Sequence, residues 1–228
     1  MSVALIADAH LGGPGGKATP LIAQLEALPG QGCSHLVLMG DIFQAWVGDR
    51  RFETPEIAAV VPVLRDLRRQ GIRIDYIEGN RDFFLADSPY ADAFDSVGLE
   101  VAFTVSGRRF LAVHGDGLND RDWPYRFWRR LSKSAPSRFL VRRIPGALAR
   151  RLVDSTEQRL SQTNFKHKAV LPEEPIRRYA ELRLAEGYDA LLLGHFHEAR
   201  VWDVAGGRVL LLEAWFKSRQ VEWAKLLP

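Results

Sequence analysis

The residues with the clearest chemical potential are histidines and carboxylates that follow short apolar runs. The run 191–194 leads into His195 and His197, two histidines one residue apart. In an extended segment, residues i and i+2 point the same way, so the two imidazoles could aim at one point. Imidazole nitrogen is a common ligand of divalent transition-metal ions. An exposed loop without a metal gives the same pattern, so this pair alone decides nothing.

Four more apolar runs upstream end in the same way. In chain order, the side chains that follow them are Asp8 with His10, then Asp41, Asn80 and His114. Four of the six histidines in the chain stand at such run ends. Polar ligands that converge at strand ends are what a sheet-based active site requires. The pattern therefore predicts a metal site assembled from several strands.

The composition is that of a globular chain with a substantial core. The 228 residues are 46% apolar, with a mean hydropathy of −0.14, which suits one large domain or one domain with an insertion. The single cysteine, Cys33, excludes an internal disulfide framework and a cysteine-rich zinc site. No apolar run approaches the length of about 18 residues that crosses a bilayer, and residues 2–7 are too short for a secretion signal. We therefore expect a cytoplasmic protein that at most docks on a membrane.

A basic block interrupts an otherwise acidic chain. Residues 121–168 hold thirteen Lys or Arg against three Asp or Glu, although the net charge of the chain is only +3. Trp123, Tyr125, Phe127 and Trp128 alternate with the arginines at the start of this block. The pattern predicts two or three amphipathic helices, inserted over 121–168 into a single domain that spans 1–228. They could form a solvated cap, a lid that covers an oily anionic substrate, or a nucleic-acid surface.

The rest of the chain predicts alternating strands and helices. Helices are expected over 18–28, 55–70 and 173–186, and strands over 2–7, 35–39, 72–77, 100–105, 108–113, 189–194, 200–204, 208–213 and 219–223. A glycine-rich stretch at 12–17 resembles a phosphate-binding loop only superficially, because Ala18 stands where Ser or Thr should follow Lys17. We expect this stretch to be a loop that leads into the first helix.

Seven ligands are too many for one ion and suit two. The predicted set is Asp8, His10, Asp41, Asn80, His114, His195 and His197. Two ions about 3.5–4 Å apart need a bridging carboxylate, for which we choose Asp41. Asp8, His10 and His197 would then hold one ion, and Asn80, His114 and His195 the other. Nitrogen and hard oxygen ligands without thiolate suit Mn²⁺, Fe²⁺ or Zn²⁺.

Such a centre predicts hydrolysis of a phosphate ester or anhydride. It lowers the pKa of a bridging water, which gives a hydroxide nucleophile, and it stabilises charge on the phosphoryl oxygens. No protein nucleophile is then required. Arg81 could bind phosphate in a bidentate manner, and a surface ion pair between Arg81 and Asp82 is the alternative.

These motifs together resemble those of a known superfamily. In chain order they are Asp8-x-His10, Gly40-Asp41, Gly79-Asn80-Arg81-Asp82, His114-Gly115-Asp116 and Gly194-His195-x-His197. Their order and spacing resemble the calcineurin-like metallophosphoesterases over nearly the whole chain. Residues 40–49, 79–84 and 114–122, with Tyr125 and residues 214–215, are similar to those of the UDP-2,3-diacylglucosamine diphosphatases of lipid A biosynthesis. The resemblance implies an α/β fold with two mixed β-sheets, flanked by helices and carrying a helical lid.

The resemblance also implies a reaction and a binding site. Water would attack the pyrophosphate of UDP-2,3-diacylglucosamine and release UMP and 2,3-diacylglucosamine 1-phosphate, with Mn²⁺ as the expected metal. Substrate contacts would come from Asn80, Arg81, Asp122 and His195, and from Asn164 and Lys168 in the lid, where Ser161 and Lys166 stand nearby. The chain departs from the usual Gly-His-Thr-His-Arg-Pro pattern, since residues 194–199 read GHFHEA.

Partners follow from the same resemblance and from the basic block. We expect an acylated nucleotide-sugar substrate, an anionic membrane surface at the inner face of the inner membrane, no nucleic-acid partner, and a monomer. The alternative enzymatic interpretation is a metallophosphoesterase for another nucleotide diphosphate, phosphodiester or nucleic acid. A metal site that only scaffolds a partner-binding surface would need a missing ligand, and none of the seven is missing.

Overall fold

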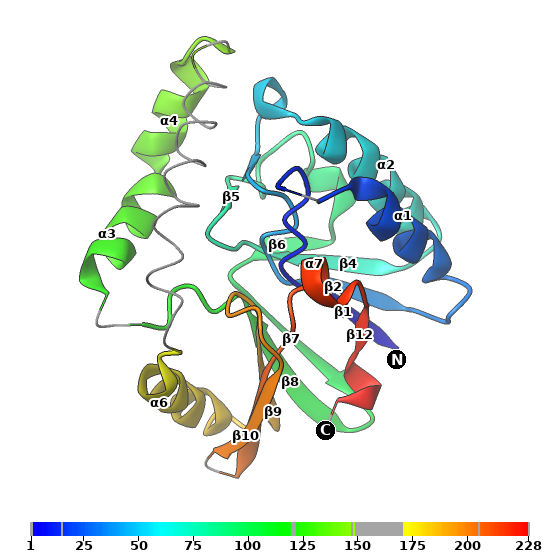
Figure 1. The fold of residues 1–228 in the computed structure, drawn as a ribbon, viewed down its shortest axis with the longest axis vertical. Coiled ribbons are helices and arrows are strands. Elements are labelled where there is room, and N and C mark those ends of the chain that lie inside the picture. Colours follow the sequence, from blue (N-terminus) through cyan, green and yellow to red (C-terminus); the bar gives the residue numbers. More distant parts are fainter. Residues whose placement is uncertain are drawn as a thin grey trace.

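Two five-stranded sheets form the centre of the molecule. The structure is a computed structural model that describes residues 2–14, 16–119, 122–146, 148, 171–204 and 206–227. The first sheet has the order β12-β1-β2-β4-β6, and the second has the order β10-β11-β9-β8-β7. A short third sheet pairs β3 with β5. Figure 1 shows the two large sheets between helices, which is the α/β sandwich that the sequence predicted.

The first sheet is built on three parallel strands. These are β1 (Val3–Ile6), β2 (His35–Leu38) and β4 (Arg73–Ile77). Strand β6 (Ser96–Gly98) extends the parallel set, and β12 (Glu222–Trp223) adds an antiparallel edge to β1. The residues of β1, β2 and β4 are buried except Arg73 at the start of β4, and most of them are apolar, as expected for strands covered on both faces.

The second sheet joins a hairpin to a parallel centre. Strands β7 (Glu100–Val105) and β8 (Arg108–Val113) pair antiparallel, as predicted, and β8 is parallel to β9 (Ala190–Leu193). Strand β11 (Gly207–Leu211) is parallel to β9 and antiparallel to the edge strand β10 (Arg200–Val204). Exposed and buried residues alternate along β7, the other edge strand, because only one of its faces is covered.

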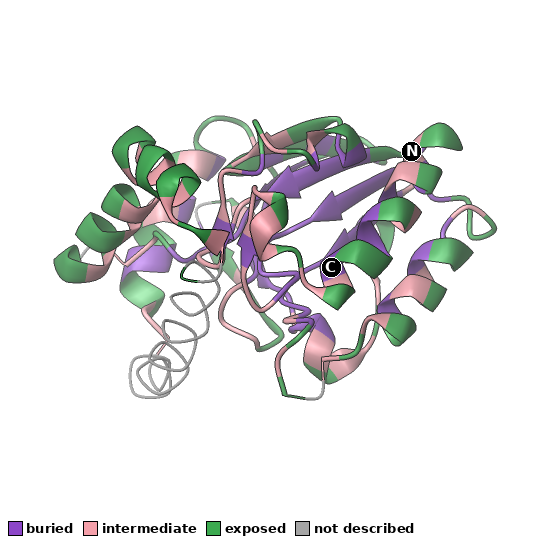
Figure 2. Ribbon diagram, turned by 90° about the horizontal axis from the view of Figure 1, so that it is seen from above, coloured by how far each residue is buried: buried purple, intermediate pink, exposed green. Residues whose placement is uncertain are grey.

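Helices cover the outer face of each sheet. Helices α1 (Ala18–Ala27) and α2 (Pro55–Arg69) pack on the first sheet, and α6 (Glu173–Leu184) packs on the second. A separate apolar cluster lies between the two sheets, where Leu5 and Val37 meet Phe103 and Leu192. Figure 2 shows the strands as a buried interior beneath helices that expose one side. Because the central strands of both sheets are buried on both faces, the strand ends are the places where polar side chains can reach a common site.

Two further helices lie beside the sandwich and cover neither of its outer faces. After β8 the chain forms α3 (Trp123–Ser132) and α4 (Ala135–Arg143), and neither helix contains a fully buried residue. Both figures show this pair at one side of the molecule. The N-cap side chains of Asp122 and Ser134 accept backbone N–H groups in the first turn of each helix. Most of the remaining predicted lid, residues 149–168, lies outside the described residues. No helix among the described residues is long and apolar enough to cross a bilayer.

The C-terminal strand prediction was wrong in part. The sequence predicted one strand over 219–223, whereas the structure has helix α7 (Trp215–Ser218), a left-handed residue at Arg219 with φ of 52°, and β12 over only two residues. The alternation of polar and apolar residues after 218 does suit an edge strand. The left-handed turn at Arg219 ends α7 and delays the strand. The short strands β3 (Trp46–Val47), β5 (Asp82–Phe83) and β6 were not predicted.

Candidate metal centre

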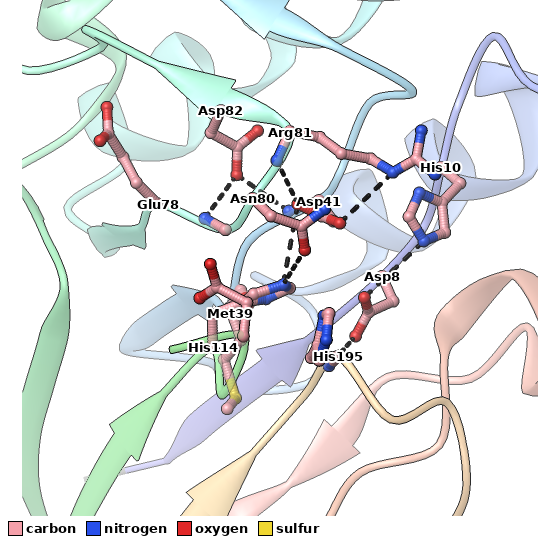
Figure 3. Close-up of polar contacts among 12 residues, drawn as sticks. Asp8, His10, Met39, Asp41, Glu78, Asn80, Arg81, Asp82, His114 and His195 are labelled. Atoms are coloured by element: carbon pink, nitrogen blue, oxygen red, sulfur yellow. Dashed lines mark hydrogen bonds and ion pairs between the residues drawn. The ribbon is translucent and has the colours of Figure 1, made fainter. Parts of the chain in front are cut away.

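The predicted ligands gather where the parallel strands of both sheets end. Asp8 follows β1, Asp41 follows β2 and Asn80 follows β4, whereas His114 follows β8 and the last two histidines follow β9. Figure 3 shows the side chains of Asp8, Asp41, Asn80, His114 and His195 gathered at the ends of the two sheets. The side chains of Asp8, Asp41 and His114 are almost fully shielded from solvent. The fold thus brings the seven residues, which span 190 positions of sequence, to one edge.

Asp8, His10 and His197 form one cluster of potential ligand atoms. The Nε2 atom of His197 lies 3.0 Å from Oδ1 of Asp8, and Nε2 of His10 lies 3.7 Å from the same oxygen. The two imidazole nitrogens are 3.2 Å apart. Ligands that bind one divalent ion at about 2.0–2.2 Å are separated by similar distances. The spacing and the two-nitrogen, one-carboxylate chemistry therefore fit a transition-metal ion.

His114 lies at the centre of a second cluster. Its Nε2 atom is 3.2 Å from Oδ1 of Asn80 and 3.7 Å from Oδ1 of Asp41. Its Nδ1 atom lies 2.8 Å from the carbonyl oxygen of Met39, which can only accept a hydrogen bond. Nδ1 therefore carries a proton, and Nε2 faces Asp41 and Asn80.

Asp8 is shared by the two groups of metal-capable side chains. The ligand atoms of Asp8, Asp41 and His114 lie within 4.8 Å of one another, as do those of Asp8, His10 and His197. The bridging role of Asp41 stays a prediction. Two clusters that share one carboxylate fit a pair of neighbouring ions.

The side chains of His195 and His197 lie on different sides of the centre. The His197 ring contacts the His10 ring at 5.1 Å, whereas the His195 ring contacts the His114 ring at 5.2 Å. Both histidines are left-handed, with φ of 65° and 59°. The expectation that an extended segment aims both imidazoles at one point was therefore wrong. The backbone turns at each residue, and this turn sends the rings to the two clusters.

Left-handed backbone is concentrated at the predicted ligands. Among the described residues, eight non-glycine residues have positive φ, and five of them are predicted ligands: Asp8, His10, Asp41, His195 and His197. This conformation costs an L-residue roughly 1–2 kcal/mol. Strain of this kind persists only where the surrounding structure holds it, and it clusters at functional sites.

The two buried carboxylates have opposite electrostatic environments. Burial raises the pKa of Asp8, but the hydrogen bond from His197 and the charges of nearby histidines lower it further, to well below its usual range. Burial raises the pKa of Asp41; the charge of Asp8 adds to the rise, and His114 and Arg81 offset only part of it. Two carboxylates in one buried site repel each other, and a bound cation relieves that repulsion.

Two glycines allow the ligand loops to approach closely. A Cβ atom on Gly79 would lie 2.3 Å from Oδ1 of Asp41, and one on Gly40 would lie 2.7 Å from Nδ1 of His114. Gly40 also has φ of 87°. Larger residues at either position would displace a predicted ligand, so both glycines are part of the site.

Arg81 contacts Asp41 and not its sequence neighbour. Its Nε atom lies 3.5 Å from Oδ2 of Asp41, and its backbone N–H donates to Oδ1 at 2.9 Å. Asp82 is fully buried and accepts the backbone N–H groups of Asp41 and Gly79, at 2.9 and 2.8 Å. The alternative of a surface ion pair between Arg81 and Asp82 was therefore wrong. Burial and the charge of Asp41 raise the pKa of Asp82 to about 7.

The other predicted substrate contacts divide into two groups. Asp122 is described, and its side chain accepts the backbone N–H of Tyr125 at 3.1 Å as the N-cap of α3. Asn164 and Lys168, like Ser161 and Lys166, lie outside the described residues.

Sequence reasoning missed two lysines that support the ligand loops. Lys133 donates to the carbonyl of Gly79, and Lys217 donates to the carbonyl of His197 at 2.6 Å. Both act on backbone groups through tertiary contacts, which leave no local sequence signal.

Comparison with known proteins shows which relatives the chain resembles. No family model matches it. The UDP-2,3-diacylglucosamine hydrolase of Pseudomonas fluorescens is 31% identical, over 92% of this chain and 86% of that protein. The enzyme of the same name from Stenotrophomonas maltophilia is 28% identical, over 97% of this chain and 94% of that protein.

Solved structures agree on the fold. The phosphopantetheinyl hydrolase of Mycobacterium tuberculosis matches with a TM-score of 0.50 at 16% identity, over 100% of this chain and 96% of that one. A protein from Aquifex aeolicus described as of unknown function matches with a TM-score of 0.50 at 13% identity, over 98% of this chain and 96% of that one. The length of the sequence match to the two hydrolases is what identifies the family. The chain belongs to the UDP-2,3-diacylglucosamine hydrolase family.

Proposed function

We propose that the protein hydrolyses the pyrophosphate bond of UDP-2,3-diacylglucosamine and releases UMP and 2,3-diacylglucosamine 1-phosphate. The observation that carries the proposal is the pair of ligand clusters that share Asp8 at the ends of both sheets. The names of the relatives, matched over nearly the whole chain, supply the substrate. A phosphoric anhydride is a suitable target for such a centre because charge builds on its oxygens during hydrolysis.

The proposed metal positions follow the two clusters. Asp8, His10 and His197 would hold one divalent ion, and Asn80, His114 and His195 the other, with Asp41 between them. When bound, the two ions would supply an acidified water as nucleophile and positive charge for the phosphoryl oxygens. We propose Mn²⁺, with Fe²⁺ or Zn²⁺ as alternatives, because the donors are imidazole nitrogen and hard oxygen without thiolate.

Arg81 is proposed to hold a phosphate of the substrate. Its guanidinium lies beside Asp41 and also donates to the carbonyl of Gln44 at 3.0 Å, so its position is fixed before substrate binds. A preset guanidinium can bind phosphate with little loss of side-chain entropy. Asn80 and His195 would contact the substrate from the same edge, and Asp122, Asn164 and Lys168 from the side of the lid.

The α3–α4 helices are proposed to form a lid, within residues 121–168, for the acyl chains. Trp123, Phe139 and Leu140 are between 57% and 69% exposed, and arginines lie among them. Apolar side chains next to arginines suit an acylated phosphate compound and an anionic lipid surface. We therefore propose that the protein works in the cytoplasm at the inner face of the inner membrane, where such a substrate resides.

A ³¹P NMR time course tests the proposed reaction. Protein loaded with Mn²⁺ should convert UDP-2,3-diacylglucosamine to UMP and a sugar 1-phosphate, and the Asp8→Ala variant should not. A protein that hydrolyses bis(p-nitrophenyl) phosphate but leaves this substrate intact would refute the lipid substrate and keep the metal centre. Other nucleotide diphosphates and single-stranded nucleic acid would then be screened, and a steep salt dependence would indicate nucleic acid.

A further inference from the structure

Lys133 connects helix α3 to the loop that carries Asn80. The residue is the C-cap of α3, and its Nζ atom donates to the carbonyl oxygen of Gly79 at 2.7 Å. The same atom lies 3.4 Å from Oε2 of Glu78, and the two side chains are only 13% and 14% exposed. A contact shielded to this degree holds its geometry better than an exposed ion pair does.

Gly79 is held at both of its backbone polar groups. Its N–H donates to the buried carboxylate of Asp82, and its carbonyl oxygen accepts from Lys133. The next residue in the chain is Asn80, whose Oδ1 atom lies 3.2 Å from Nε2 of His114. Two side chains, one from the core and one from α3, thus set the position from which Asn80 reaches the centre.

Helix α3 also contacts the loop that carries His114. The guanidinium of Arg129 pairs with Asp116, which lies two residues after His114. The hydroxyl of Tyr125 donates to the same carboxylate at 2.7 Å. One helix therefore contacts the two loops whose side chains form the Asn80–His114 side of the centre.

The opposite side of the centre has a different support. Lys217 of α7 donates to the carbonyl oxygen of His197, and α7 lies in the sandwich beside β1, since the N–H of Trp215 donates to the carbonyl of Ala7 at 2.8 Å. The two sides of the centre are thus supported by elements that differ in how firmly they are packed. Helix α7 has the buried residue Trp215, whereas α3 has none.

We propose that Lys133 is a positioning residue that couples the docking of α3 to the second metal position. When α3 lies against the Gly79 carbonyl, Asn80 is aligned with His114; when α3 moves away, that alignment is lost. Glu78 neutralises the lysine charge, so Lys133 orients a peptide group and does not present its charge to a phosphate. The inference rests on the proposed two-ion centre and adds a link between the lid helix and the completeness of that centre.

Titration of the metal-free, full-length protein with Mn²⁺ by calorimetry tests the coupling without any substrate. Lys133→Met should weaken one of the two Mn²⁺ equivalents by about tenfold and leave the other within about twofold, as expected for the loss of a group behind a ligand. Lys133→Arg should recover most of the affinity because its guanidinium can still donate to the Gly79 carbonyl. Thermal melts of both variants check that they are folded.

Arg138→Gln is the matched control. Arg138 pairs with Asp87 and so joins α4 to the body of the protein, but Asp87 adjoins no predicted ligand. The control should bind both Mn²⁺ equivalents as the unmodified protein does. A similar loss in Arg138→Gln would mean that any disturbance of the helical pair weakens the metals, which would overturn the role of Lys133.

Other outcomes would also overturn the proposal. Unchanged binding of both equivalents by Lys133→Met would do so, as would an increase in the KM for bis(p-nitrophenyl) phosphate with unchanged Mn²⁺ affinity, which would indicate a direct substrate contact. If the protein does not hydrolyse the proposed lipid substrate, the Mn²⁺ titration can still be interpreted. The proposed function and this inference can therefore fail separately. Binding of a single Mn²⁺ by the unmodified protein would remove the two-ion centre and this inference together.

Discussion

The buried carboxylate of Asp82 accepts the backbone N–H of Asp41 across a distance of 2.9 Å. It accepts the N–H of Gly79 as well, so a single side chain ties together two of the loops that carry predicted ligands. Asp82→Ala would leave both N–H groups unsatisfied in a buried place. Each such group costs about 1–3 kcal/mol.

We expect Asp82→Ala to lose about 2–4 kcal/mol of unfolding free energy and most activity on bis(p-nitrophenyl) phosphate. Asp82→Asn, which keeps a carbonyl oxygen for the two donors, should retain much of both. Urea unfolding and phosphodiesterase assays measure the two effects. An alanine variant as stable and as active as the asparagine variant would contradict the role of these hydrogen bonds.

Asp82 also predicts a pH dependence of the metal-free protein. Its pKa is raised to about 7, because burial and the charge of Asp41 disfavour the carboxylate, whereas an unfolded Asp titrates near about 4. Between these values the folded state holds a proton that the unfolded state has lost. The unfolding free energy must therefore fall as pH rises from about 4 to 7.

Urea unfolding in EDTA at several pH values measures this fall. The decline should be smaller in Asp82→Asn, which has no proton to release at this position. Asp8 does not affect this comparison. Its pKa is shifted downward, so its contribution to the unfolding free energy changes only below about pH 4. Parallel pH profiles for the two proteins would contradict the raised pKa.

Metal analysis can show whether Asp41 or Asp8 is the bridging carboxylate. Asp41→Ala should abolish activity and lose both ions, if Asp41 bridges as proposed. Asp8 belongs to both ligand clusters, so the metal content of Asp8→Ala is compared with that of Asp41→Ala. His197→Ala should lose one ion. Metal content after gel filtration, measured by plasma mass spectrometry, gives the answer. An Asp41→Ala protein that retains two ions would transfer the bridging role away from Asp41.

The exposed apolar residues of α4 predict a substrate-dependent loss of activity. Replacing both Phe139 and Leu140 by serine should reduce activity on the diacylated substrate by at least about tenfold, because each apolar side chain buried by an acyl chain contributes roughly 1.5–3 kcal/mol. Hydrolysis of bis(p-nitrophenyl) phosphate should be unchanged. Equal losses on both substrates would show that these residues support the fold rather than the acyl chains.

A buried ion pair far from the centre predicts acid sensitivity. Asp75 lies in β4, with Oδ2 at 2.8 Å from Nε2 of His35 and 2.9 Å from Nε of Arg73, and it accepts from the hydroxyl of Ser96. Burial raises the pKa of Asp75, but these hydrogen bonds lower it further, to below its usual value. The stabilisation is therefore present above the unfolded pKa and is lost as pH falls through the folded pKa.

Asp75→Ala should lose roughly 3 kcal/mol of unfolding free energy at pH 7, since it leaves the buried His35 without its carboxylate partner. The difference from the unmodified protein should shrink below about pH 4. Urea unfolding at pH 7 and pH 3 tests both points, and Mn²⁺ binding should remain intact. A difference that stays constant down to pH 3 would show that packing, and not the ionised carboxylate, is responsible.

The sequence predicted the parts of the fold that depend on local pattern. The hairpin over 100–105 and 108–113 is correct to the residue, because alternation and a Ser-Gly turn fix its register. Of the strand expected over 219–223, only residues 222–223 form β12, because the left-handed residue Arg219 that ends α7 delays the strand. Strands of two or three residues, such as β3 and β6, are determined by their tertiary neighbours and have too few residues to form a pattern.

The site shows the same division between local and tertiary information. The convergence of the ligands followed from the strands that carry them, since parallel strands end at a common edge. The assignment of His195 and His197 to opposite sides could not follow from alternation, because their left-handed backbone is set by contacts with other loops. The support from Lys133 and Lys217 depends on helices that meet the ligand loops only in the folded protein.

The left-handed backbone at five predicted ligands has a consequence for how this protein can change over generations. Glycine occupies this conformation more easily than histidine or aspartate does. Variants sorted for heat tolerance alone should therefore accumulate glycine at positions 10, 195 and 197, whereas Asp8 and Asp41 also accept backbone hydrogen bonds that glycine cannot replace. Selection for activity and selection for stability therefore act in opposite directions at these residues. A descendant that is no longer selected for catalysis would gain folding stability by losing ligands of its metal centre.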